Sequence, residues 1–331
     1  MKEISAKGTP AKKFIRQAAL LAFVLLFAFA AVGCSDDSKT VMTVGGEDVP
    51  LYEYRYFFLN NKRELYGSDA ELSAEDVSEL QKMCAENVKN RHALSILTKK
   101  YDVKLSDDDE KKLDELVSAL KSNYADDKAY NAALSGDFLT EKLYRELNRD
   151  SLLALAAVDK MVADGLIPAK EGGVTDALRL GEMVCLKEIY VYYPSEETRE
   201  IAQKRAEEAL SRLEGGEDFE TLMREYSNYS AENLPYDSGY YTMKYDALDV
   251  VWDTAERLAV GEHSGIVESE YGFHIILRCA PDEKYAAEHL DELYEIYSQS
   301  KFYEKFYEIY NNLTPEFTEY GRKLDFAKIS M

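Results

Sequence analysis

The sequence predicts an α+β protein in three parts. Residues 40–180 show mainly helical periodicity, residues 181–281 begin and end with β-type alternation, and residues 282–331 return to a helical pattern. The chain has 331 residues, which is room for about two domains. We therefore expect a small sheet-containing part between two helical ones.

The chain begins with a segment typical of an export signal. Basic residues precede an apolar run from Ala18 to Val32, and Gly33 lies directly before Cys34. The run is shorter than the roughly 20 residues of a membrane-spanning helix. The pattern resembles the signal peptides of bacterial lipoproteins, which implies removal of residues 1–33 and a lipid on the sulfur of Cys34. An uncleaved anchor helix is the alternative, and both place the rest of the chain outside the cytoplasm at a membrane surface.

The composition excludes one class of partner. The chain has 62 acidic and 40 basic residues, a formal net charge of -22, and without residues 1–33 this becomes -26. Such a charge argues against nucleic-acid binding and against attraction to anionic lipid, so that a lipid on Cys34 would have to provide the membrane attachment. Cys84, Cys185 and Cys279 match no metal-site spacing, and neither a metal nor another cofactor is expected.

The first part should be a short strand followed by helices. The expected elements are a strand with a Gly45–Gly46 turn at 40–50 and helices at 51–60, 77–101, 107–123 and 140–162. Ser73 and Ser106, each with an aspartate three residues later, should cap the second and third helices. Residues 164–176 contain glycines and a proline and should form a link. His92 is interpreted as a packed or surface residue of its helix.

The middle part should follow the order β-α-α-loop-α-β. The expected elements are strands at 183–193 and 273–279, helices at 198–216, 218–227 and 250–258, and a turn-rich stretch at 234–243. The first strand, "MVCLKEIYVYY", alternates and is rich in β-branched and aromatic residues, whereas the first helix ends on two glycines.

Three stretches of this part resemble the parvulin-type peptidyl-prolyl isomerases. They are "RLEGGEDFETLMREYS", "DSGY" and "LAVGEHSGIVESEYGFHIILR", and the last is the most specific. The resemblance implies an FKBP-like antiparallel-sheet domain at 181–281. The flanking parts further resemble exported foldases of the PrsA/SurA type, which implies that residues 34–180 and 282–331 together form a helical chaperone module into which the parvulin domain is inserted.

The resemblance also implies the site residues. A prolyl isomerase must bind the twisted amide better than either planar form, and parvulins surround it with two histidines, a loop Asp or Cys, and a Ser or Thr. His274 matches the second histidine, Asp237 the loop carboxylate and Ser269 the hydroxyl, while Glu188 stands in place of the first histidine. The residues that match the proline pocket are Tyr241, Leu248 (or Ala247), Val251 and Trp252. The alternative is that His274 serves strand packing, with its ring bonded to Glu188.

Cys185 and Cys279 should lie on the face of the sheet away from this site, because they are an odd number of residues from Glu188 and His274. If their strands pair antiparallel, as in the family, the two are cross-strand neighbours, either as a disulfide or as two buried thiols.

Three functions compete. The first is an extracytoplasmic foldase with prolyl isomerase activity, and the second is a parvulin-like holdase with weak or no catalysis. The third is a solute-binding lipoprotein, which is disfavoured because the long helices of this chain do not alternate with strands as a two-lobed α/β binding protein would require. The expected partners are unfolded exported proteins with X-Pro segments, and a homodimer is left open. Aromatic residues at 51–60 and 294–310 are expected to line a client groove, or else to seal the helices together.

Overall fold

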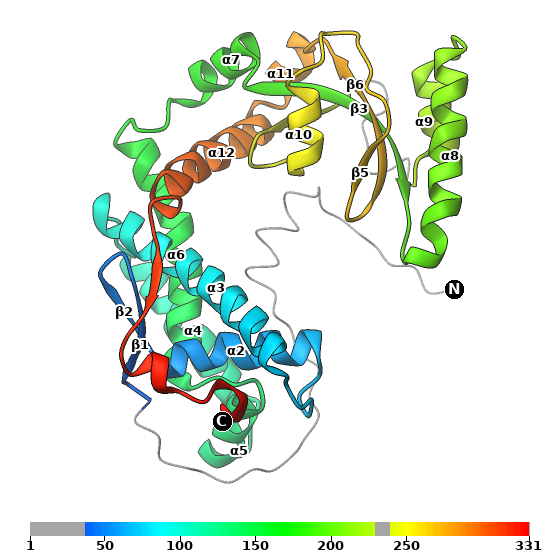
Figure 1. Ribbon diagram of the computed structural model, residues 1–331. Coiled ribbons are helices and arrows are strands. Elements are labelled where there is room, and N and C mark those ends of the chain that lie inside the picture. The colour runs from blue at the N-terminus through cyan, green and yellow to red at the C-terminus, as the bar shows by residue number, and fades with distance from the viewer. Residues whose placement is uncertain (1–36, 229–238, 331) are drawn as a thin grey trace. The chain divides into compact units, whose positions relative to one another are not determined.

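The structure is a computed structural model that describes residues 37–228 and 239–330 (Figure 1). The expected export signal, Cys34 and Asp237 lie outside the described residues. The described chain forms two compact units, one of Val162–Glu304 and one of the residues up to Met161 together with those from Lys305 onward. Within the described ranges, no helix combines the length and the apolar character needed to cross a membrane.

The second unit contains a small sheet that joins the two ends of the described chain. Strand β1 (Thr40–Val44) pairs antiparallel with β2 (Glu47–Pro50) on one side and with β7 (Pro315–Phe317) on the other. Gly45 and Gly46 connect the first two strands with φ of 58° and 83°, as the sequence predicted for a tight turn. The Thr318 hydroxyl donates to the Thr40 carbonyl at 2.7 Å, and Figure 1 shows the blue and red segments side by side.

Five helices are described in this part of the chain. They are α2 (Leu51–Leu65), α3 (Ala74–Lys100), α4 (Asp107–Ser122), α5 (Asp127–Gly136) and α6 (Glu141–Ala163). Both predicted caps are confirmed, because the Ser73 and Ser106 hydroxyls accept the backbone N–H groups of Asp76 and Asp109 at 3.2 and 3.1 Å. Helix α5 was not predicted, although Asp126 caps it in the same way.

An aromatic core holds helix α2 to the C-terminal segment. The Tyr54 ring lies against Phe317 and Phe326, with centroids 5.8 and 5.5 Å apart, and the Phe58 ring lies 6.0 Å from that of Phe326. Tyr54 and Phe58 are fully buried, so these two of the aromatic residues at 51–60 do not line a client groove. Sealing is the role of these rings. In α12 (Leu290–Tyr310) the aromatic residues Tyr297, Phe302 and Phe306 are buried as well.

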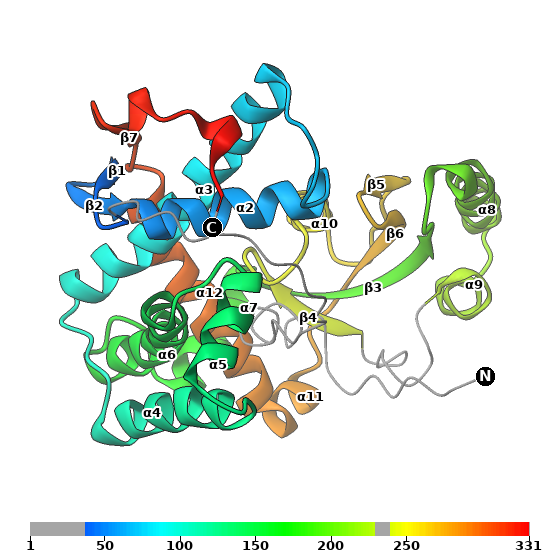
Figure 2. The ribbon, with the colours of Figure 1, turned by 90° about the horizontal axis from the view of Figure 1, so that it is seen from below.

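The first unit is built on a four-stranded antiparallel sheet. Its strands, in the spatial order β4-β3-β6-β5, are β3 (Met183–Tyr192), β4 (Tyr240–Met243), β5 (Val267–Ser269) and β6 (Gly272–Cys279). Figures 1 and 2 show α8 (Glu196–Glu214) and α9 (Phe219–Tyr226) on one face of this sheet and α10 (Asp249–Ala255) on the other. The predicted order is confirmed, with two short strands added, and so is the α+β fold class.

Helix α7 (Lys170–Leu180) corrects the sequence analysis, which expected a link there. The helix contains Gly172 and Gly173, and glycine lowers helix propensity by about 1 kcal/mol. Packing explains why the helix forms, since a Cβ on Gly173 would meet the Tyr297 ring at 2.6 Å. The remaining described elements are α11 (Glu283–Glu288) and two short 3-10 helices, Gly321–Lys323 and Phe326–Lys328.

Candidate functional site

The register of β3 and β6 places three of the described polar residues on one face of the sheet. Tyr190 lies opposite His274, and Glu188 lies opposite Ile276. Because side chains two residues apart share a face, Glu188, Tyr190 and His274 all point to the same side. Glu188 and His274 are therefore diagonal neighbours, close enough for direct contact.

A chain of hydrogen bonds runs through this face. His274 Nδ1 contacts Glu188 Oε1, and His274 Nε2 lies 2.7 Å from the Ser269 Oγ at the end of β5. The side chains of Glu188 and His274 are almost fully buried, with residue exposures of 3% and 1%. A carboxylate can only accept, so Glu188 accepts the hydrogen bond from Nδ1–H, and Nε2 of the neutral ring accepts from the Ser269 hydroxyl. The ring is thereby held in one tautomer.

Two tyrosines contact this chain, one by a hydrogen bond and one by ring stacking, and neither was predicted from the sequence. The Tyr240 hydroxyl donates to Glu188 Oε2 at 3.2 Å. The Tyr190 ring stacks on the His274 ring with centroids 5.0 Å apart and an interplanar angle of 29°. Tyr190 could have been found from its position two residues after Glu188 on an alternating strand.

Helix α10 forms an apolar floor beside these polar groups. Val251 and Trp252 are buried against Leu186 and Ile276 of the same sheet face, and Leu248, which precedes the helix, is partly buried in the same cluster. The structure thus brings the predicted Glu188, His274, Ser269, Leu248, Val251 and Trp252 to one side of the sheet.

Tyr241 lies elsewhere. It pairs with Cys185 on the opposite face, its ring stacks on Tyr285 with centroids 5.3 Å apart, and its hydroxyl accepts the backbone N–H of Asp282 at 2.8 Å. The structure does not bring Tyr241 together with the other predicted residues. Its neighbour Tyr240 occupies the site face instead, because a shift of one residue along a strand reverses the direction of the side chain.

Comparison with known proteins identifies both parts of the chain. Residues 183–280 match the PPIC-type PPIASE domain, and residues 7–156 match a SurA-like N-terminal domain. A foldase protein PrsA of Clostridium perfringens is 25% identical over 310 residues, covering 86% of this chain and 89% of the relative. The chain is similar to a PrsA foldase over most of its length.

Two further relatives illustrate how far the PrsA likeness extends. The foldase protein PrsA of Halalkalibacterium halodurans is 31% identical over 189 residues, which cover 55% of this chain and about half, 54%, of that relative. The crystal structure of PrsA from Bacillus subtilis is 22% identical, covers 83% of this chain and 93% of its own, and gives a TM-score of 0.28.

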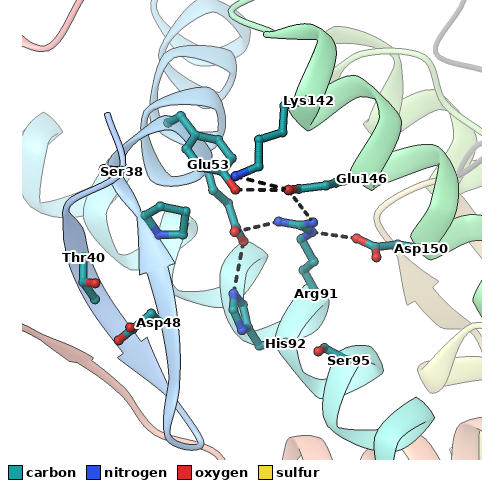
Figure 3. A pocket seen from close by; sticks show the side chains of 12 residues that line it. Ser38, Thr40, Asp48, Glu53, Arg91, His92, Ser95, Lys142, Glu146 and Asp150 are labelled. Carbon is teal, nitrogen blue, oxygen red and sulfur yellow. Dashed lines mark hydrogen bonds and ion pairs between the residues drawn. The ribbon is translucent and has the colours of Figure 1, made fainter. Parts of the chain in front are cut away.

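The SurA-like N-terminal domain contains a second polar cluster, around a cavity of ≈ 370 Å³ (Figure 3). Arg91 of α3 lies at its centre and forms ion pairs with Glu53 of α2 at 2.6 Å and with Glu146 and Asp150 of α6 at 3.1 and 2.6 Å. His92 contacts Glu53 at 3.2 Å and Glu47 at 2.9 Å, so it is a packed residue, as predicted. No sequence pattern marks this cluster, which we call the Arg91 network.

Burial and pairing oppose each other in the Arg91 network. Burial lowers the pKa of His92, but its bonds to Glu53 and Glu47 outweigh burial and raise the pKa above the ordinary value. Burial raises the pKa of Asp150 despite its pairing with Arg91. Over residues 37–228 and 239–330, no cluster of three or more potential ligands is placed to hold a metal ion. The network therefore joins α2, α3 and α6 through paired charges.

Proposed function

We propose that this protein is an extracytoplasmic foldase whose residues 181–281 isomerise X-Pro bonds in unfolded exported proteins. The observation that carries the proposal is the buried chain Glu188–His274–Ser269 beside the apolar floor of α10, inside a PPIC-type domain. The helical parts at 34–180 and 282–331 would hold the unfolded segments, in keeping with the SurA-like domain that covers most of the first of them.

Isomerisation needs a shaped site more than a reactive group. No bond is broken, and the barrier of about 18–20 kcal/mol arises from the lost amide resonance. Leu248, which is partly buried and packs against the buried Val251 and Trp252, offers apolar contact to a proline ring. Ser269, the half-buried member of the chain, offers polar contact to the twisted amide. His274 acts as a positioning residue, because its ring is buried and both nitrogens are occupied.

Glu188 sets the rate in this proposal. It stands where a parvulin carries its first histidine, and it fixes the proton of His274 on Nδ1, so the ring cannot exchange donor and acceptor roles. We expect isomerisation by this chain to be measurable but slower than that of a parvulin with two histidines. A holdase with no catalysis is the second candidate, and it is favoured by the burial of His274.

The test is a cis-to-trans isomerisation assay of the purified chain on peptides with varied residues before the proline. Glu188→His should raise the rate several-fold, Trp252→Leu should lower it, and Glu188→Gln should change it little, because an amide oxygen still accepts from Nδ1. Glu268→Gln is a matched control, because Glu268 adjoins Ser269 yet pairs with Arg199 at 2.6 Å.

Two results would contradict the proposal. A wild-type chain that does not accelerate isomerisation, while still suppressing aggregation of an unfolded client, would establish the holdase. A fast wild-type chain that Glu188→Gln inactivates would make Glu188 a catalytic group in its own right.

Membrane attachment through a lipid on Cys34 is part of the proposed function. It rests on the sequence of residues 1–34, an apolar run that ends in small residues and a cysteine. In cells that express the full chain, Cys34→Ala should leave an unprocessed and unlipidated precursor. If mass spectrometry of that variant shows normal cleavage at another residue, the lipoprotein assignment is refuted.

A further inference from the structure

A pair of cysteines lies on the face of the sheet opposite Glu188 and His274. Cys185 near the start of β3 and Cys279 at the end of β6 are direct partners in the antiparallel register, which confirms them as cross-strand neighbours. Both are thiols and neither forms a disulfide. Directly opposed residues in antiparallel strands have Cα atoms about 4.5–5.5 Å apart, within the range of about 4.4–6.8 Å that a disulfide requires. The backbone needs no rearrangement to join them.

The two thiols differ in exposure. Cys185 is buried: its register partner on β4 is Tyr241, and a Cβ on Gly239 would lie 2.9 Å from the Cys185 Sγ. Cys279 is partly exposed. A cavity of ≈ 270 Å³ is lined by both cysteines, and Arg179 and Arg278 also line it. A reagent can therefore reach Cys279 first.

The acidity of the two thiols differs in the same direction. A hydrogen bond from Cys185 lowers the pKa of Cys279 to about 7, with a smaller contribution from the charge of Lys187. The same bond and burial raise the pKa of Cys185. Cys84, the third cysteine of the described chain, is buried in α3, and burial raises its pKa to about 12. Among the three cysteines that the structure describes, Cys279 is thus the reactive thiol, Cys185 its partner and Cys84 the inert one.

We infer that Cys185 and Cys279 form a thiol–disulfide exchange site that reacts with disulfides, with Cys279 as the attacking thiol and Cys185 as the resolving one. The Cys279 thiolate attacks one sulfur of a disulfide RS–SR, forming a mixed disulfide and releasing RS⁻, which takes up a proton. Cys185 then gives up its proton, and its sulfur attacks the Cys279 sulfur and releases the second RS⁻, which is protonated. The dithiol loses two electrons and two protons, and RS–SR becomes two RSH.

This site is independent of the proposed isomerase function, because its cysteines lie on the other face of the sheet. The substrate class is a disulfide bond, which could belong to a small molecule or to an exported client. The resulting cross-link would join β3 to β6, the two strands that carry Glu188 and His274.

The test uses the reduced full chain with oxidised glutathione as the probe, followed by thiol alkylation, digestion and mass spectrometry. We expect a linked Cys185–Cys279 peptide, while Cys84 is alkylated only after unfolding. Cys185→Ser should accumulate a glutathione adduct on Cys279. Cys279→Ser should leave Cys185 at least tenfold less reactive in the folded chain, because the Cys185 thiol is buried.

The contrary results are equally definite. Failure of wild type to form the link, or equal adduct formation in the two single variants, would overturn the inference. A second arm replaces glutathione with a disulfide-linked peptide at equal concentration. Faster oxidation by the peptide would identify a client disulfide as the substrate, and faster oxidation by glutathione a small-molecule one. Oxidation by neither would refute the site.

Discussion

The Arg91 network gives the sharpest stability prediction. Arg91→Met removes the guanidinium but keeps most of the stem, so that the change is mainly one of charge. The Glu53 side chain is 2% exposed and loses its ion pair with Arg91 at 2.6 Å, although His92 remains beside it. The carboxylates of Glu146 and Asp150 are 29% and 27% exposed and can be hydrated.

The expected loss follows from this difference in burial. Breaking a buried ion pair by removing one partner costs about 3–5 kcal/mol, and the remaining His92 contact places the loss at the low end, about 3 kcal/mol. In a unit of this size that corresponds to a fall in Tm of roughly 6–12 °C. Glu53→Gln added to Arg91→Met removes the stranded charge and should recover about half of the lost stability.

The assay uses two probes in parallel. Trp252 is the only tryptophan of the chain and lies in the PPIase domain, so its fluorescence follows that domain, whereas circular dichroism follows all helices. Arg91→Met should shift the urea transition seen by circular dichroism and leave the Trp252 transition unmoved. Arg145→Met is the matched control, because Arg145 is 39% exposed and pairs with the 66% exposed Asp114. A loss below about 0.5 kcal/mol for Arg91→Met, or a double variant no more stable than the single one, would refute the reasoning.

Three further predictions concern the same unit. Gly321→Ala should destabilise it by about 2 kcal/mol, since a Cβ there would lie 2.1 Å from the Val41 carbonyl oxygen. Gly136→Ala should stabilise it by about 0.5 kcal/mol, since a Cβ there would meet no atom within 4 Å. Equal urea midpoints of the two variants would contradict this prediction. The pKa of His92 is raised in the folded state, so the extra stability of wild type over His92→Gln should be greatest just below the ordinary pKa of 6.5. This difference in the free energy of unfolding should be lost as the pH rises through the higher pKa of the folded state. A difference that grows with pH in urea titrations would have the wrong sign. Ser73→Ala removes the bond from the Asp76 backbone N–H to the Ser73 hydroxyl but keeps the backbone N–H of residue 73 that donates to the Asp76 carboxylate. It should cost about 1 kcal/mol by thermal unfolding, and an unchanged Tm would show that the serine cap is dispensable.

The sequence could predict the elements with a strong local signal. The alternation of β3 and β6 placed Glu188 and His274 on one face and the two cysteines on the other, and the Ser73 and Ser106 caps marked the starts of two helices. These signals act over a few residues, so tertiary packing does not alter them.

The elements that the sequence missed depend on packing between distant residues. Strand β5 has only three residues. Helix α7 forms in spite of its two glycines, because Gly173 lets the Tyr297 ring pack closely against the helix. Whether Tyr240 or Tyr241 points to the site depends on the pairing register of β3 and β4, which no local sequence pattern determines. The Arg91 network joins three helices, and the groove at 51–60 was inferred from aromatic content, which does not distinguish a surface from a core.

The pairing of β1 with β7 determines the order in which the chain can fold as it is made. The Thr318 bond to Thr40 spans 278 residues, so at about 5–20 residues per second the first strands wait roughly 14–56 s for their partner. The residues of the PPIase domain, 183–280, are contiguous and are complete before β7 is synthesised. The nascent chain therefore contains the complete PPIC-type domain while Tyr54 and Phe58 still lack Phe317 and Phe326, and the aromatic core of the second unit stays incomplete for that interval.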